Sequence, residues 1–317
     1  MAQRYHMDAD FPGWPRRPTL EAAAALYFLA CVGRVALNLA GYLVALAFPG
    51  LDGQGVNWGL NLLYQAGFLL LPVARYCQER PGMGTGLRLR RCPPLALFLC
   101  ALAAVAALFL ADSLGTLWLV LLEVLGARLS LAAPAMDNGL MALLLSALLP
   151  AVCEELMFRG MILSAWERRG SRRALVMSGL LFACLHGSVE GFPVHLALGL
   201  ALGALVLGSG SLYAGMLFHL LYNGLSLVLS GGGQTGQTLL AQIGGLQGVW
   251  TLLARTGLYG MVLCGLTWGV WAVGDSENAP PQPRQAMPLS AIVVLAGGLV
   301  TTLCVYLIDL LSLWGVL

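Results

Sequence analysis

The chain alternates long apolar runs with short polar connections. Nine apolar segments stand out, at residues 20–48, 57–74, 93–122, 138–165, 174–188, 193–208, 211–230, 250–273 and 288–315. Several reach or exceed the roughly 20 residues that a helix needs to cross a hydrocarbon core. The runs lack the apolar/polar alternation of a barrel strand, and lipid accepts only helices or closed barrels. The pattern therefore predicts an all-α polytopic membrane protein.

The helix count and the division of the chain follow from the same runs. The second segment is interrupted near Pro72, and the fifth and sixth are short, so we expect about eight to nine transmembrane helices. We divide the chain into N-terminal transmembrane helices (1–137), a core that holds the candidate functional residues described below (138–230) and C-terminal transmembrane helices (231–317).

Composition narrows the class of protein further. Hydrophobic residues make up 59% of the 317 residues and charged residues only 10%, against about 25% charged in soluble domains. The net charge of +2 argues against nucleic-acid binding, which needs a concentrated basic surface. The partners we expect are the lipid bilayer and substrates associated with it.

Arginine placement predicts the orientation. The stretches 75–91 and 167–173 are rich in arginine, and two predicted helices separate them, so both lie on one side of the membrane. Basic loops favour the cytoplasm. This places the N-terminal tail, with Arg4, Arg16 and Arg17, in the cytoplasm of a cell that we take to be bacterial, and we expect the catalytic cavity to open on the same side.

Ionisable residues within membrane segments are costly and are functional candidates by default. Glu154 and Glu155 are adjacent in the fourth segment, and Arg159 follows Glu155 by four residues, so that pair shares one helix face. Glu154 is left without a partner in its own helix, which makes it a candidate general base. The alternative is an ion-paired helix end that reaches the interface.

Two further segments carry polar pairs at i,i+4 spacing. Phe182 and His186 share one face of the fifth segment, and His219 and Asn223 share one face of the seventh. Taken singly, each pair could be a structural polar contact between helices. Counted from the arginine-rich side at 1.5 Å per residue, however, Glu154, His186 and His219 lie within about 6 Å of one another in depth. We therefore expect all three, with Asn223, to converge on one cavity.

Other polar residues in the segments are expected to be structural. His195 follows Pro193 near the end of the sixth segment and is interpreted as a capping or interface residue. Arg34, Asp112 and Asp309 are interpreted as structural ion pairs or interface residues.

The three motifs together resemble the signature of the CAAX protease and bacteriocin-processing (CPBP, or ABI) family. They are Glu154-Glu155-x-x-x-Arg159, Phe182-x-x-x-His186 and His219-x-x-x-Asn223. The resemblance covers about 90 residues, roughly 138–230. It implies a CAAX-protease-like intramembrane endopeptidase with a conical active-site cavity, with Glu154 as the base and His186, His219 and Asn223 lining the site.

The resemblance leaves the role of a metal open. One Glu and two His, namely Glu154, His186 and His219, would satisfy a three-ligand zinc site with an open position, whereas glutamate-activated water needs no metal. Glu155 and Arg159 are interpreted as supporting residues. If Glu154 ligated a metal, Glu155 would have to serve as the base, although its spacing pairs it with Arg159. The alternative function is non-catalytic: a scaffold or immunity protein, or a transporter, that uses the same polar cluster for binding. A transporter typically shows inverted repeats, and none is visible.

Overall fold

The computed structural model of the chain describes residues 7–8, 11–15, 17–80, 82–129, 139–229, 238–274 and 287–316. Its elements are β1 (Met7–Asp8), β2 (Phe11–Pro15), α1 (Leu20–Ala47), α2 (Gly53–Leu63), η1 (Tyr64–Leu70), α3 (Leu71–Gln78), α4 (Met83–Gly86), α5 (Pro94–Val124), α6 (Gly139–Leu143), η2 (Leu144–Leu148), α7 (Leu149–Glu155), η3 (Leu156–Leu163), α8 (Ser164–Trp166), η4 (Glu167–Arg169), α9 (Ser171–His186), α10 (Phe192–Ser209), α11 (Leu212–Leu229), α12 (Leu239–Gln242), α13 (Gly245–Val273) and α14 (Leu289–Leu313).

All nine predicted apolar segments are helical, which confirms an all-α polytopic membrane protein. Seven helices in the described part of the chain are long and apolar enough to cross a membrane. The two predicted segments outside that set are the continuous helix 53–78 and the 16-residue α9. A short antiparallel hairpin, β1–β2, precedes α1 and was not predicted.

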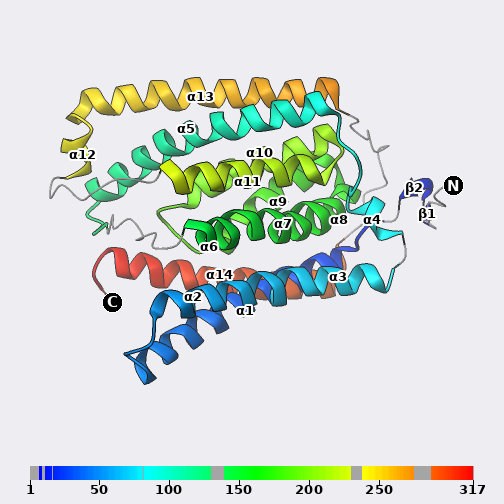
Figure 1. The fold of residues 1–317 in the computed structure, drawn as a ribbon, viewed down its shortest axis with the longest axis horizontal. Coiled ribbons are helices and arrows are strands. Elements are labelled where there is room, and N and C mark those ends of the chain that lie inside the picture. The colour runs from blue at the N-terminus through cyan, green and yellow to red at the C-terminus, as the bar shows by residue number, and fades with distance from the viewer. Residues whose placement is uncertain are drawn as a thin grey trace.

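The long helices lie side by side, with the N-terminal end of the chain at one end of the bundle and the C-terminal end at the other (Figure 1). Helix α13 packs on α5, and α10 packs on both α9 and α13. Helix α11 contacts α5, α10 and α7. Helices α1 and α14 pair with each other and lie on the opposite side from α13 (Figure 1). The segment 139–229 thus occupies the centre of the bundle (Figure 1).

Prolines explain two wide turns in helices that reach the centre. Pro72 stands at the start of α3, after the π-helical η1, and Pro150 at the start of α7, after the π-helical η2. Proline has no N–H to donate and crowds the carbonyl of the preceding turn, so the backbone widens locally. A third π-helical stretch, η3, directly follows Glu155.

A cluster of buried charge closes one end of the bundle. Glu167 accepts hydrogen bonds from both Arg17 and Arg88, and Arg88 also donates to the hydroxyl of Ser164 at 2.7 Å. Arg90 Nε donates to the carbonyl of Gly210 at 2.6 Å. The segment after α4 is therefore fastened to the ends of α8 and α10, and we call this region the closed end.

Some predictions concern positions outside the described residues. These are Arg4 and Arg16 and the proposed boundaries at 137/138 and 230/231. The division into three regions remains a prediction.

Candidate active site

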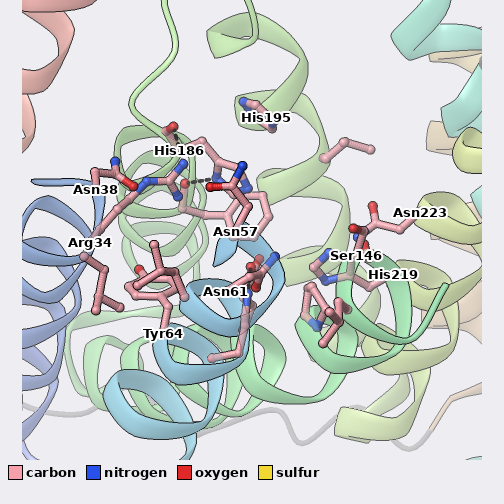
Figure 2. A pocket seen from close by; sticks show the side chains of 18 of the residues that line it. Arg34, Asn38, Asn57, Asn61, Tyr64, Ser146, His186, His195, His219 and Asn223 are labelled. Carbon is pink, nitrogen blue, oxygen red and sulfur yellow. Dashed lines mark hydrogen bonds between the residues drawn. The ribbon is translucent and has the colours of Figure 1, made fainter. Parts of the chain in front are cut away.

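A cavity of about 600 Å³ lies between α1, the helix 53–78, α7, α9, α10 and α11. The four residues predicted to form the site, Glu154, His186, His219 and Asn223, all line it. Figure 2 shows Arg34 and Asn38 on one side of the cavity and His219, Ser146 and Asn223 on the other. The structure thus brings together the four residues that the motifs singled out, while their roles in a reaction remain predictions.

Glu154 has no charged partner within hydrogen-bonding distance among the described residues. Its side chain is in the cavity wall and only 9% exposed. Oε1 accepts a hydrogen bond from Gln65 Nε2 at 3.0 Å. Oε2 is buried and has no hydrogen-bond partner in the described part of the chain. Buried polar atoms are normally satisfied, so this oxygen is available to a water molecule or a substrate.

Glu155 is held in a different way from its neighbour. Its Oε1 accepts from Arg159 at 2.8 Å, as the i,i+4 spacing predicted, and also contacts His219 Nδ1 at 3.0 Å. Arg159 is fully buried and donates through its second nitrogen to the carbonyl of Gly199 at 3.0 Å. A Cβ at Gly215 would lie 2.7 Å from Glu155 Oε2. Glycine at position 215 therefore allows α11 to pack closely against Glu155.

The two site histidines are fixed through the same ring nitrogen. His186 Nδ1 lies 2.8 Å from the carbonyl of Phe182, and His219 Nδ1 lies 3.0 Å from Glu155 Oε1. A carbonyl can only accept, and an ionised carboxylate can only accept, so Nδ1 carries the proton in each ring. With the proton on Nδ1, Nε2 of a neutral imidazole presents a lone pair. Phe182 packs against both, with ring centroids 4.6 Å from His186 and 6.0 Å from His219.

Asn223 is anchored at the edge of the cavity. Its Nδ2 donates to the carbonyl of Ser146 at 3.1 Å, which ties α11 to the wide turn before Pro150. A primary amide has two N–H groups and an acceptor oxygen. Asn223 therefore keeps hydrogen-bonding capacity for a peptide in the cavity.

Sequence reasoning missed three cavity residues. His195 stacks on His186 with centroids 4.0 Å apart, and its buried Nδ1 has no partner among the described residues; it is not the interface residue that we predicted. Its i,i+4 spacing to Gly199 could have placed it on the same face of α10. Arg34, predicted to be a structural or interface residue, lines the cavity and donates to the carbonyl of His186 at 3.0 Å. For Arg34 the signal was its charge within a membrane segment, whereas Gln65 comes from a helix outside the motifs, where the sequence gives no such signal.

The side chains of the site include donor groups that could bind a zinc ion. Two imidazoles whose Nδ1–H groups are held by a carboxylate and a carbonyl have the supporting contacts that zinc-binding histidines usually show. However, the described residues contain no group of three His, Cys, Asp or Glu side chains arranged to hold a metal. The types of donor atom suit zinc, but the three side chains do not form such a group. Zinc at Glu154, His186 and His219 remains a prediction.

The cavity opens away from the arginine-rich loops. Along the helix that starts at Gly139, Ser146 is exposed and Glu154 is buried, and the arginines of 168–173 follow further on. The helix 53–78 shows the same order, from exposed Asn57 to buried Gln65 and then to Arg75. Our expectation that the cavity opens on the side of the arginine-rich loops is therefore wrong. Counting residues along the motifs predicts how deep the site lies in the membrane. It does not predict at which end of the bundle the neighbouring helices leave the cavity open.

The fold and the cavity define a polytopic membrane protein with a buried polar site. Residues 136–225 match the profile of the type II CAAX prenyl endopeptidase Rce1-like family. The match spans all three motifs, confirms the resemblance to CAAX proteases and points to a protease. No curated protein matches the chain, and no solved structure does.

Proposed function

We propose that the chain is an intramembrane endopeptidase of the CAAX-protease type, which hydrolyses peptide bonds of membrane-associated substrates with water activated by Glu154. The observation that carries the proposal is that Glu154 lines a cavity of about 600 Å³ and has only the amide of Gln65 as its hydrogen-bond partner among the described residues, with no counter-charge. The Rce1-like match supports the same class of reaction. In this proposal the protein lies in the cell membrane of a bacterium, with its N-terminus in the cytoplasm.

The contacts suggest how the residues divide the reaction. Glu154 accepts a proton from water, the resulting hydroxide adds to the peptide carbonyl, and Glu154 then passes the proton to the departing amine. The second hydrogen of that water is donated to Nε2 of one of the two histidines, His186 or His219, which orients the water. Asn223 donates to the oxyanion that develops. Glu155 and Arg159 do not meet the substrate; they hold His219 and α10 in place.

Glu154→Gln tests the proposal most simply. The amide keeps the size of the side chain and removes the base, so hydrolysis should fall by at least about 10²-fold. Bacterial membrane vesicles that contain the wild type or the variant would be incubated, and new peptide termini mapped by mass spectrometry, which requires no known substrate.

Glu190→Gln is the matched control, because Glu190 lies in the connection between α9 and α10 and is not among the residues that line the cavity. Termini present with the wild type and Glu190→Gln but absent with Glu154→Gln are the expected result. The same termini in all three samples would remove Glu154 from the reaction.

A zinc-assisted reaction is the alternative route within the same class, with His186, His219 and Glu154 as the ligands. Prolonged dialysis against a chelator separates the two routes. If Glu154 alone activates water, the rate should stay unchanged. A loss that added zinc restores, together with zinc retained by the wild type and not by His186→Ala in elemental analysis, would favour the metal.

The non-catalytic alternative makes a different prediction for the same variant. A scaffold, immunity protein or transporter would keep its cellular phenotype as Glu154→Gln, because a neutral amide preserves most of the contacts of a carboxylate. No observation in the described residues favours this alternative over hydrolysis.

A further inference from the structure

The residues that line the cavity are exposed at one end and buried at the other. We call the buried end the dry end. The exposed lining residues lie on α1, α2 and η2, and we call this region the mouth; they are Asn38, Tyr42, Asn57 and Ser146. Buried lining residues lie deeper in the bundle; they include Gln65, Glu154, Leu202, Phe218 and His219. The helices therefore admit a substrate from the mouth.

Beyond the dry end, the described part of the bundle is filled by buried side chains. Met157, Phe158 and Met161 are fully buried on the helix that carries Glu154. Behind them, Glu167 binds Arg17 and Arg88 at the closed end. Two smaller pockets in the described part of the chain hold about 10 Å³ or less. A peptide that starts at the closed end would have to break this buried ion cluster before it reached Glu154.

The basic residues of the connecting segments are distributed unequally between the two ends. The closed end carries Arg75, Arg80, Arg88, Arg90, Arg91, Arg168, Arg169, Arg172 and Arg173. At the mouth end, the connecting segments that the structure describes contain Arg128 alone. Arginine-rich connections stay in the cytoplasm during insertion. Arg88 is buried in the ion cluster, but the difference between the two ends does not depend on it. The exposed Arg91, Arg172 and Arg173 also lie at the closed end.

From these two observations, we infer that the cavity opens to the extracytoplasmic face and that its substrates are peptide segments on that side, close to a membrane anchor. Ser146 at the mouth and Glu154 are eight residues apart, or about 12 Å along a helix. A substrate must therefore extend about four residues into the cavity to reach Glu154. The amides of Asn38, Asn57 and Asn61 line its route and can bind an extended backbone. A tail that remains in the cytoplasm cannot reach the site.

Cysteine labelling in intact bacterial cells tests the orientation. Asn57→Cys and Ser146→Cys place a thiol at the mouth, and Thr85→Cys and Arg172→Cys place one at the closed end. The wild-type chain, with its eight native cysteines, sets the background. A membrane-impermeant maleimide should label the two mouth variants in intact cells and the two closed-end variants only after permeabilisation. The reverse pattern, or labelling of both ends in intact cells, would overturn the inference.

Fusions to the full chain provide a second test that needs no new cysteine in the protein. Helix α14 ends at the mouth end (Figure 1), so a protein fused after Leu317 reports on that side. Alkaline phosphatase needs disulfides that form outside the cytoplasm, and its fusion should be active. A fusion to green fluorescent protein exported by the general secretory route should be dark. If the phosphatase fusion were inactive and the green fluorescent protein fusion were fluorescent, the mouth would lie in the cytoplasm.

The inference about substrates rests on the proposed protease function, but the two can fail separately. Mouth labelling together with unchanged hydrolysis in Glu154→Gln would leave the orientation standing and remove the proposed chemistry. Cytoplasmic labelling of the mouth together with a loss of hydrolysis in Glu154→Gln would do the opposite.

Discussion

At the closed end, Glu167 is buried between Arg17 and Arg88, whereas in the cavity wall Glu154 is buried with the amide of Gln65 as its partner. Both carboxylates are removed from water, a costly step that a protein normally offsets with an opposite charge. Glu167 receives two such charges. Glu154 receives none within hydrogen-bonding distance, although each of the two carboxylates keeps one oxygen without a hydrogen-bond partner in the described residues. The difference distinguishes a carboxylate that holds helices together from one positioned for chemistry.

Glu155 is adjacent to Glu154 in the sequence, but like Glu167 it is paired with a buried arginine, Arg159. Glu155→Gln should leave Arg159 fully buried without a counter-ion, which typically costs about 3–5 kcal/mol of stability. The thermal unfolding midpoint in detergent should fall well below that of the wild type. Because Glu155 also holds His219 Nδ1, turnover per folded molecule should fall as well.

The double variant Glu155→Leu/Arg159→Met removes both charges and serves as the control. It should recover part of the lost unfolding midpoint, since an apolar pair leaves no buried charge. If Glu155→Gln unfolds at the wild-type temperature, the ion pair does not support the site.

Glu167→Gln should destabilise the closed end, by about 3 kcal/mol, through the same loss of a buried counter-ion. The expected contrast with the cavity is that turnover per folded molecule stays at the wild-type level, because Glu167 lies beyond the dry end of the cavity. Unfolding and turnover would be measured on one preparation. A large loss of turnover with unchanged unfolding would mean that the closed end takes part in the reaction.

His195→Phe should have the smallest effect. Phenylalanine keeps the ring that stacks on His186 and removes both nitrogens, so turnover should stay within about tenfold of the wild type if His195 only shapes the wall. His195→Ala, which removes the ring, is the comparison. A loss of about 10²-fold in His195→Phe would instead indicate that the unpartnered Nδ1 handles a proton or a substrate.

The sequence predicted the parts of this site that are local along one helix. The i,i+4 spacings placed Glu155 beside Arg159, and counting residues from the arginine-rich loops placed Glu154, His186 and His219 at one depth. The contacts between helices could not be predicted in this way. His219 meets Glu155 and Gln65 meets Glu154 only because α11 and η1 pack against the helix that carries the two glutamates. The direction of the mouth depends on the same packing, and there the prediction failed.

The central claim is that Glu154 reacts while the paired charges hold the fold, and one measurement on Glu154→Gln tests it most directly. Turnover and the unfolding midpoint would be determined on the same vesicle preparation, beside the wild type. The account predicts a loss of hydrolysis of at least about 10²-fold with an unfolding midpoint that is nearly unchanged, since the amide of Gln65 can still bond to the new side chain. Retained hydrolysis by a well-folded Glu154→Gln protein would contradict the account.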